Sequence, residues 1–177
     1  MRKLNVLEMN RISVDEFKKS KKNPLVVVLD NVRSMYNVGS VFRTADAFRI
    51  EAIYLCGITS CPPHPEIHKT ALGAEDAVDW EYCKNAIETV KALQQQGYEV
   101  LAVEQVEGST MLQDFTPEPD KKYAVVLGNE VKGVSQEVVD CCDGCLEIPQ
   151  FGTKHSLNVS TTAGIVMWEI TRKKLMK

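Results

Sequence analysis

Short runs of apolar, mostly β-branched residues recur along this chain, and segments with helical periodicity separate most of them. Runs that are apolar throughout are typical of strands buried on both faces, as in parallel sheets that helices cover on each side. The alternation therefore predicts an α/β fold with a parallel sheet in a single domain. We expect strands at 25–29, 52–56, 98–103, 123–127 and 145–148, and helices at 13–20, 37–48, 85–96, 135–142 and 158–174.

Local signals support several of these boundaries. Ser13 and Glu16 form a capping-box pair at the start of the first helix, and Gly97 is expected to end the third helix. The segment 61–75 holds three prolines, so we expect it to be irregular, with one or two helical turns. In the last helix the apolar residues recur at the spacing of a core-facing surface, namely Val159, Ala163, Val166, Met167 and Ile170.

The chain length of 177 residues is typical of one domain. No apolar run is long enough to cross a membrane, and the first ten residues lack the apolar core of a signal peptide. We therefore expect a soluble, cytoplasmic protein. Residues 1–23 are expected to form a helical extension and residues 24–177 the main domain.

Two groups of residues raise the question of a metal site. Cys61, His64 and His68 have spacings that zinc ligands could use, and Cys142 and Cys145 form a CxxC pair. Neither group supplies the four ligands of a structural zinc site. In a reducing compartment the six cysteines are better explained as small apolar side chains, so no metal is expected.

The net charge of −3 hides an uneven distribution. Residues 1–23 carry seven basic and three acidic side chains, and residues 169–177 carry four basic and one acidic. Basic clusters can contact phosphate groups, or they can be solvated ends; charge alone favours solvated ends. The residues concerned are Lys18, Lys19, Lys21 and Lys22 near the start and Arg172, Lys173, Lys174 and Lys177 near the end.

The loops that follow the strands are the expected place for a site. In parallel sheets, ligands bind beyond the carboxyl ends of the strands, which here are residues 29, 103, 127 and 148. Three of these loops pair glycine with polar residues and lead into a helix, where free N–H groups favour anions. The segment from Gly128 to Ser135 is not a P-loop, because Val134 stands in place of the lysine. No GxGxxG motif follows the first strand, so a dinucleotide site is not supported either.

Three segments, taken in order, are similar to the motifs of a known family. They are Asn37-Val-Gly-Ser-Val-Phe-Arg43-Thr-Ala45, then Leu127-Gly-Asn-Glu130-Val-Lys-Gly133, then Ile148-Pro149 followed by Ser156-Leu-Asn-Val-Ser160. Together they resemble the SpoU, or TrmH-like, branch of the SPOUT RNA methyltransferases. One such motif is a weak signal, but three in the family's order are specific, and the resemblance covers about residues 24–172.

The resemblance implies a parallel-sheet SPOUT fold whose C-terminal half forms a deep trefoil knot. It also implies a homodimer that does not contact membranes, with S-adenosylmethionine as cofactor and a ribose 2′-hydroxyl of RNA as methyl acceptor. By position, three loops would hold the cofactor, mostly through backbone groups, with Val103, Glu104, Leu127, Gly128, Ile148, Ser156 and Leu157.

The resemblance further implies catalytic positions. Arg43 matches the family residue proposed to activate the hydroxyl, but a guanidinium with a pKa above about 12 is a poor base. We therefore expect Arg43 to position phosphate and to stabilise the developing alkoxide. Asn37 is expected to orient Arg43 or the ribose, Glu130 to order the loops, and Ser156 and Asn158 to support the methionine end of the cofactor. Taken singly, Asn37 and Asn158 could instead cap helices, and Arg43 could form a surface ion pair.

Many relatives carry an additional N-terminal RNA-binding domain, whereas about 23 residues precede the first strand here. We therefore expect the catalytic domain and its basic ends to hold the RNA. By analogy, tRNA is somewhat favoured over rRNA as substrate. Two other classes stay open, a non-catalytic RNA-binding relative and an unrelated nucleotide-binding α/β enzyme. The RNA-binding residues expected on this basis are Lys18, Lys19, Lys21, Lys22, Arg172 and Lys173.

Overall fold

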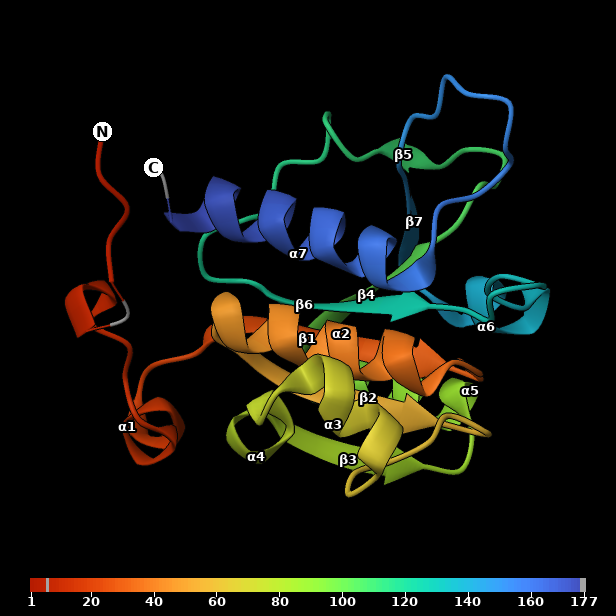
Figure 1. Ribbon diagram of the computed structural model, residues 1–177. Coiled ribbons are helices and arrows are strands. Elements are labelled where there is room, and N and C mark those ends of the chain that lie inside the picture. Colours follow the sequence, from red (N-terminus) through yellow and green to blue (C-terminus); the bar gives the residue numbers. More distant parts are fainter. Residues whose placement is uncertain (6, 176–177) are drawn as a thin grey trace.

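A seven-stranded parallel sheet forms the centre of the protein, as a computed structural model that describes residues 1–5 and 7–175 shows (Figure 1). All strand pairs are parallel, which confirms the predicted α/β class. The strand order is β3-β2-β1-β6-β4-β7-β5. The strands are β1 (Asn23–Asp30), β2 (Ile50–Cys56), β3 (Asp79–Cys83), β4 (Tyr98–Val103), β5 (Thr110–Met111), β6 (Lys122–Leu127) and β7 (Gly144–Glu147).

Helices cover both faces of this sheet. The helices are α1 (Val14–Lys19), α2 (Met35–Ala47), α3 (Pro65–Ala71), α4 (Ala74–Ala77), α5 (Ala86–Gln95), α6 (Gln136–Cys141) and α7 (Val159–Leu175), after a 3₁₀ turn at Leu7–Met9. In Figure 1, α7, α2 and α3 lie one above the other on the near face. Among the described residues, none of these helices has the length and apolarity that a membrane crossing requires.

The central strand β1 contributes to two separate cores. Leu25, Val27 and Leu29 pack with α2 and α7, whereas Val26 and Val28 pack with α5 and α6. All five side chains are at most 1% exposed. Burial on both faces explains why this strand reads as a continuous apolar run instead of an alternating one.

The structure corrects several sequence-based boundaries. Strand β3 was not predicted, because it is an edge strand with four exposed residues and no apolar run. Strand β5 has two residues and carries little pattern. The segment 61–75 is more regular than expected, since His64 caps α3 with its side chain and Pro65 occupies the first turn. Helix α2 begins at Met35 with Ser34 as its cap, so Asn37 lies inside the helix and does not cap it.

Helices α2 and α3 touch at Gly39, where a side chain would not fit. A Cβ at Gly39 would lie 2.2 Å from the carbonyl oxygen of Ile67 and 2.1 Å from Thr70 Oγ1. In α7, by contrast, a Cβ at Gly164 would make only an ordinary contact, 3.9 Å from Thr44.

Gly39→Ala is therefore expected to lower the free energy of unfolding by about 1–3 kcal/mol, because α3 must move away from α2. Chemical denaturation monitored by circular dichroism measures this difference. Gly164→Ala is the matched control, and it is expected to be neutral or slightly stabilising because alanine favours helix over glycine. Equal effects of the two substitutions would contradict this account of the α2–α3 contact.

The start of β1 and the last turns of α7 meet at the amino-terminal edge of the sheet. Asn23, at the start of β1, donates to Thr171 near the end of α7, with 2.7 Å between Nδ2 and Oγ1. In Figure 1 the N-terminus and the last described turn of α7 lie on the same side, opposite α6. Residues 1–23 hold α1, whose Phe17 is buried, but their separation from the 24–177 domain stays a prediction. The trefoil knot likewise stays a prediction.

Candidate active site

A pocket of about 520 Å³ opens at the carboxyl-terminal edge of the sheet. Its walls come from the loops after β4, β6 and β7 and from the first turn of α7, which are the loops that the sequence singled out. All seven predicted cofactor positions line this pocket. They are Val103, Glu104, Leu127, Gly128, Ile148, Ser156 and Leu157.

Glu104 ties two of these loops together. Its carboxylate accepts hydrogen bonds from the backbone N–H of Gln105 (2.9 Å) and of Val134 (3.0 Å). The neighbouring Gly133 has φ +66°, and a Cβ there would lie 2.0 Å from Glu104 Oε2. Only glycine therefore allows this carboxylate to reach the loop after β6.

The loop after β6 folds back on itself. Asn129 and Gly133 exchange two backbone hydrogen bonds of 3.0 and 2.8 Å. A Cβ at Gly128 would lie 2.1 Å from the carbonyl carbon of Gly133, so this position needs glycine too. The backbone of the loop itself thus fills the space that a side chain at position 128 would need.

Glu130 connects the three motifs that the sequence analysis identified. Its carboxylate accepts from the backbone N–H of Arg33 and of Ser34, each at 2.9 Å, and from Asn37 Nδ2 at 3.1 Å. Asn37 Oδ1 in turn accepts from Asn158 Nδ2 at 3.1 Å. One chain of side-chain hydrogen bonds therefore joins α2, the loop after β6 and the start of α7.

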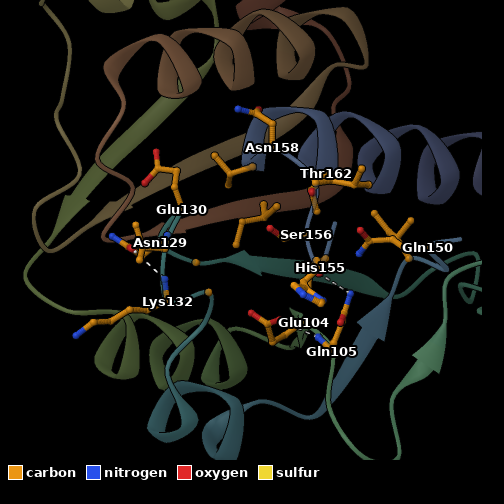
Figure 2. A pocket seen from close by; sticks show the side chains of 18 of the residues that line it. Glu104, Gln105, Asn129, Glu130, Lys132, Gln150, His155, Ser156, Asn158 and Thr162 are labelled. Carbon is orange, nitrogen blue, oxygen red and sulfur yellow. Dashed lines mark hydrogen bonds between the residues drawn. The ribbon is translucent and has the colours of Figure 1, made fainter. Parts of the chain in front are cut away.

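These bonds also keep Glu130 ionised. Burial disfavours the charged form, but the hydrogen bonds from Arg33, Ser34 and Asn37 outweigh it and lower the pKa of Glu130 below its ordinary 4.5. Figure 2 shows Glu130 at one side of the pocket and Asn158 near the start of α7, with Glu104 and His155 across from Asn158.

Asn158 has two roles in the structure. Its Oδ1 accepts from the backbone N–H of Ser160 (2.9 Å) and of Thr161 (3.3 Å), so it caps α7. Its Nδ2 remains available to hold Asn37. Capping and a place in the site, which the sequence analysis treated as alternatives, are therefore compatible. Ser156 also lines the pocket, and its side chain is exposed.

Arg43 lies apart from the other predicted catalytic residues. It is exposed on α2, almost two helical turns beyond Asn37, and it does not line the pocket. Within the described part of the chain it forms no ion pair, so it is not the surface ion pair considered as its alternative.

The basic ends lie far from the pocket. Helix α7 starts beside the pocket and runs about 25 Å to the opposite edge of the sheet. There Lys173 Nζ donates to three carbonyl groups and pairs with Glu169, which also pairs with Arg172. Lys22 donates to carbonyl groups at the end of α1. Among the lysines named above at the two ends of the chain, Lys18, Lys19 and Lys21 are exposed. Lys177 lies outside the described residues.

RNA binding by Lys18, Lys19 and Lys21 stays a prediction. Replacing all three with glutamine is expected to weaken RNA binding and to flatten its dependence on salt, because fewer counterions are released. Fluorescence anisotropy at several salt concentrations measures the slope. An unchanged slope would show that these lysines are solvated ends.

The residues considered as metal ligands have other partners. His64 Nδ1 accepts from the backbone N–H of Glu66, and His68 pairs with Glu75. Burial raises the pKa of the Cys142 thiol to about 12, and Cys145 Sγ donates to the carbonyl oxygen of Glu104. Within residues 1–5 and 7–175, no three His, Cys, Asp or Glu side chains gather as metal ligands.

The pocket suits an adenosyl cofactor in size and in lining. Small-molecule sites occupy about 300–1,000 Å³, and this pocket lies within that range. Leu127, Ile148 and Leu157 supply apolar surface to the lining, and Ser156 and Asn158 supply polar groups.

The sequence model of the SpoU rRNA Methylase family matches residues 24–168, which is most of the chain. The chain belongs to the SpoU rRNA methylase family. Within it, a 23S rRNA (guanosine-2′-O-)-methyltransferase, RlmB, of Vibrio parahaemolyticus is 30% identical over 95% of this chain and 67% of its own length. A TrmH-family protein of Staphylococcus haemolyticus, named for tRNA and rRNA, is 32% identical over 90% of this chain and 65% of its own length. The chain thus spans about two thirds of these curated relatives.

Solved structures agree with this placement. The A. aeolicus TrmH/SpoU tRNA modifying enzyme superposes with a TM-score of 0.80 at 26% identity, covering 96% of this chain and 85% of that one. An rRNA methyltransferase from Sinorhizobium meliloti with bound AdoMet gives 0.78 at 27% identity, covering 91% and 61%. The SPOUT fold is confirmed, and S-adenosylmethionine is confirmed as the cofactor of the SpoU family.

Several residues of the pocket were not predicted as site residues from the sequence. Asn129 is one, because its side chain shapes the loop by accepting from Val131 N–H and donating to the carbonyl oxygen of Asn31. Gln105 is another, since its side chain donates to the carbonyl oxygen of His155 across the pocket (Figure 2). Asn129 lay inside a quoted motif and could have been found there. Gln105 carries no local signal, because its partner is 50 residues away.

Proposed function

We propose that this chain transfers a methyl group from S-adenosylmethionine to a ribose 2′-hydroxyl of RNA. The observation that supports it most is the chain of hydrogen bonds from Glu130 through Asn37 to Asn158, whose two end residues line a cofactor-sized pocket. The SpoU family places these polar residues in its three motifs. A non-catalytic relative would have no need to keep this network in place.

The role proposed for each residue follows from its position. The bound cofactor supplies an electrophilic methyl group on its sulfonium. The loops after β6 and β7 would bind the adenosyl part, and Ser156 and Asn158, which line the same pocket, would support its methionine end. Asn37, held between Glu130 and Asn158, is placed to orient the ribose. Arg43 holds a phosphate and stabilises the alkoxide that forms as the hydroxyl loses its proton to solvent.

Whether the substrate is tRNA or rRNA is a separate question. The predicted preference for tRNA finds no support in the relatives, whose names give 23S rRNA in one case and tRNA with rRNA in another. We therefore propose RNA as the substrate class, without preference between the two. Bulk rRNA and bulk tRNA, each from cells that lack this protein, are the two substrates to compare.

The deciding experiment joins a binding and a transfer measurement. Calorimetric titration with S-adenosylhomocysteine tests the pocket, and transfer of tritium from labelled S-adenosylmethionine to each RNA pool tests the reaction. An alkali-resistant dinucleotide in the labelled RNA identifies ribose methylation and its RNA class. Binding without transfer to either pool favours the non-catalytic relative, whereas a folded protein that does not bind the cofactor contradicts the proposal.

We also propose that the protein forms a homodimer. Ile165 and Trp168 are 37% and 49% exposed on one side of α7, and the Trp168 ring lies 5.6 Å from that of Phe48 on the α2 side. Arg43 is exposed on the same layer of helices. A second copy on this layer would bury the apolar residues and would bring Arg43 of each subunit toward the pocket of its partner.

Trp168→Glu is expected to give a monomer, because a carboxylate would be buried without a partner in the interface. The monomer should bind S-adenosylhomocysteine but lose methyl transfer. Size-exclusion chromatography with light scattering measures the mass. Trp80→Glu is the matched control, since Trp80 is 36% exposed on the edge strand β3, away from α7. A dimeric Trp168→Glu variant would place the interface elsewhere.

A further inference from the structure

Phe151 is the most exposed aromatic side chain of the protein. Its exposed fraction is 97%, whereas Phe17 and Phe42 are buried and Phe48 and Phe115 are half-buried. It lies in the loop between β7 and α7, which extends away from the sheet in Figure 1. A single exposed apolar side chain needs no explanation by itself. This ring, however, belongs to a loop that lines the candidate cofactor pocket, where a ligand crossing the rim could contact it.

Hydrogen bonds hold the C-terminal end of this loop. The carbonyl oxygen of His155 accepts from Gln105 Nε2 at 3.1 Å, and Asn158 holds the start of α7. Gln150 and His155, on either side of the tip, line the cofactor pocket, whereas Phe151 does not. Phe151 is therefore held at the rim of the pocket and points outside it.

The charge of the rim indicates what kind of partner fits. The tip from Gln150 to His155 carries one cation, Lys154, and no acid, and Lys154 is exposed. Across the pocket, Lys132 and Arg33 are exposed beside the loop after β6. The pocket's own acids, Glu104 and Glu130, are occupied by backbone N–H groups. The rim therefore offers cations and one free ring, which suits a polyanion that carries flat bases.

We propose that the loop Gln150–His155 is an RNA contact, in which Phe151 stacks on an unpaired base beside the methylated nucleotide and Lys154 contacts a phosphate. This inference rests on the proposed function for the class of substrate. Stacking on aromatic rings and phosphate contacts are the usual means of holding single-stranded RNA. The position also fits, because nucleotides that flank a ribose in the pocket must cross its rim, whereas the basic ends lie at the opposite edge of the sheet.

The test compares variants by fluorescence anisotropy with a labelled single-stranded oligoadenylate and with an RNA duplex of equal length. Phe151→Ala and Phe151→Leu should each bind the single strand about tenfold more weakly, since one stacked base is lost. Phe151→Tyr should bind as the unchanged protein does. Duplex binding should not change in any of these variants, because paired bases do not offer their faces.

Lys154→Gln should reduce the slope of log affinity against log salt by about 0.7, the value for one phosphate of a single strand. Lys91→Gln, which removes a cation from the exposed side of α5, is the matched control and should leave the slope unchanged.

Two further measurements separate this inference from its alternatives. Titration with S-adenosylhomocysteine and the mass in solution should be the same for Phe151→Ala and the unchanged protein. A change in mass would show that a second copy covers Phe151, and a change in cofactor affinity would assign the ring to the cofactor site; either result overturns the inference. Unchanged single-strand affinity in Phe151→Ala, or no RNA binding by the unchanged protein, overturns it too. If methyl transfer fails while binding depends on Phe151, the proposed function is wrong and the RNA contact stands.

Discussion

Arg43→Ala is expected to reduce methyl transfer by about 100- to 1,000-fold or more, while S-adenosylhomocysteine binds with unchanged affinity. The size follows from the loss of a preorganised charge that stabilises the developing alkoxide. Unchanged cofactor binding follows from the position of Arg43, which is exposed on α2 and does not line the pocket. The measurement is single-turnover tritium transfer at saturating cofactor, beside calorimetric titration.

Arg43→Lys is the conservative control for this prediction. A lysine keeps the charge but loses the planar fork that grips phosphate with two hydrogen bonds, so transfer should recover only in part. Arg49→Ala removes an exposed arginine just beyond the end of α2 and should leave transfer unchanged. Near-normal turnover in Arg43→Ala would show that this side chain has no part in the reaction.

Subunit mixing tests whether Arg43 acts on the partner's pocket. Arg43→Ala subunits have an intact pocket without the arginine, and Glu130→Ala subunits have the arginine beside a damaged pocket. If Arg43 acts across the interface, mixing the two inactive proteins restores part of the activity, because a mixed dimer contains one complete site. If Arg43 acts within its own chain, the mixture stays inactive.

The sequence predicted the buried half of the fold well and its edges poorly. Strands β1, β4 and β6 are mostly buried on both faces. Such strands have nearly continuous apolar sequences, which can be recognised without the structure. Strand β3 has the sequence Asp-Trp-Glu-Tyr-Cys and is exposed, so its pairing with β2 depends on the neighbouring strand and not on its own composition. The pairing of an edge strand depends on tertiary contacts, which leave no alternating or apolar pattern in its own sequence.

The candidate site, like the fold, was predictable only in part. Glu104, Glu130 and Asn158 line one pocket, because loops after parallel strands converge on one edge; their roles stay predictions. Their partners could not be predicted, because each bond joins distant segments, such as Glu130 to Arg33 and Ser34. The exposure of Arg43 was not predictable either. A motif position records that a residue is needed but not whether it serves its own chain or a neighbour.

Glu130→Gln is expected to reduce transfer by about a hundredfold and to weaken cofactor binding as well. Both carboxylate oxygens of Glu130 accept hydrogen bonds, one from Arg33 N–H and the other from Ser34 N–H and Asn37. Glutamine replaces one acceptor with an NH₂ donor, which leaves a backbone N–H without a partner. A hydrogen bond to a charged group contributes about 1.5–3 kcal/mol, so the loop after β6 should move away from α2.

The pH dependence of this effect has a definite sign. The pKa of Glu130 lies below its ordinary 4.5, because its hydrogen bonds outweigh the cost of burial. The contribution of the carboxylate is therefore fully present above about pH 4.5 and is lost as the pH falls through the lowered pKa. The difference in cofactor affinity between the unchanged protein and Glu130→Gln should be constant at neutral pH and should shrink in acid.

Calorimetric titration with S-adenosylhomocysteine between neutral and acid pH measures this difference directly. Glu81→Gln on the exposed edge strand β3 is the matched control and should show no difference at any pH. A Glu130→Gln variant that binds the cofactor normally but transfers poorly would assign Glu130 to the reacting atoms. Weaker cofactor binding than in the unchanged protein, with a difference that shrinks in acid, would instead assign it to the ordering of the loops. The hydrogen bonds favour the second outcome, because every partner of the carboxylate lies on α2 or on the turn before it.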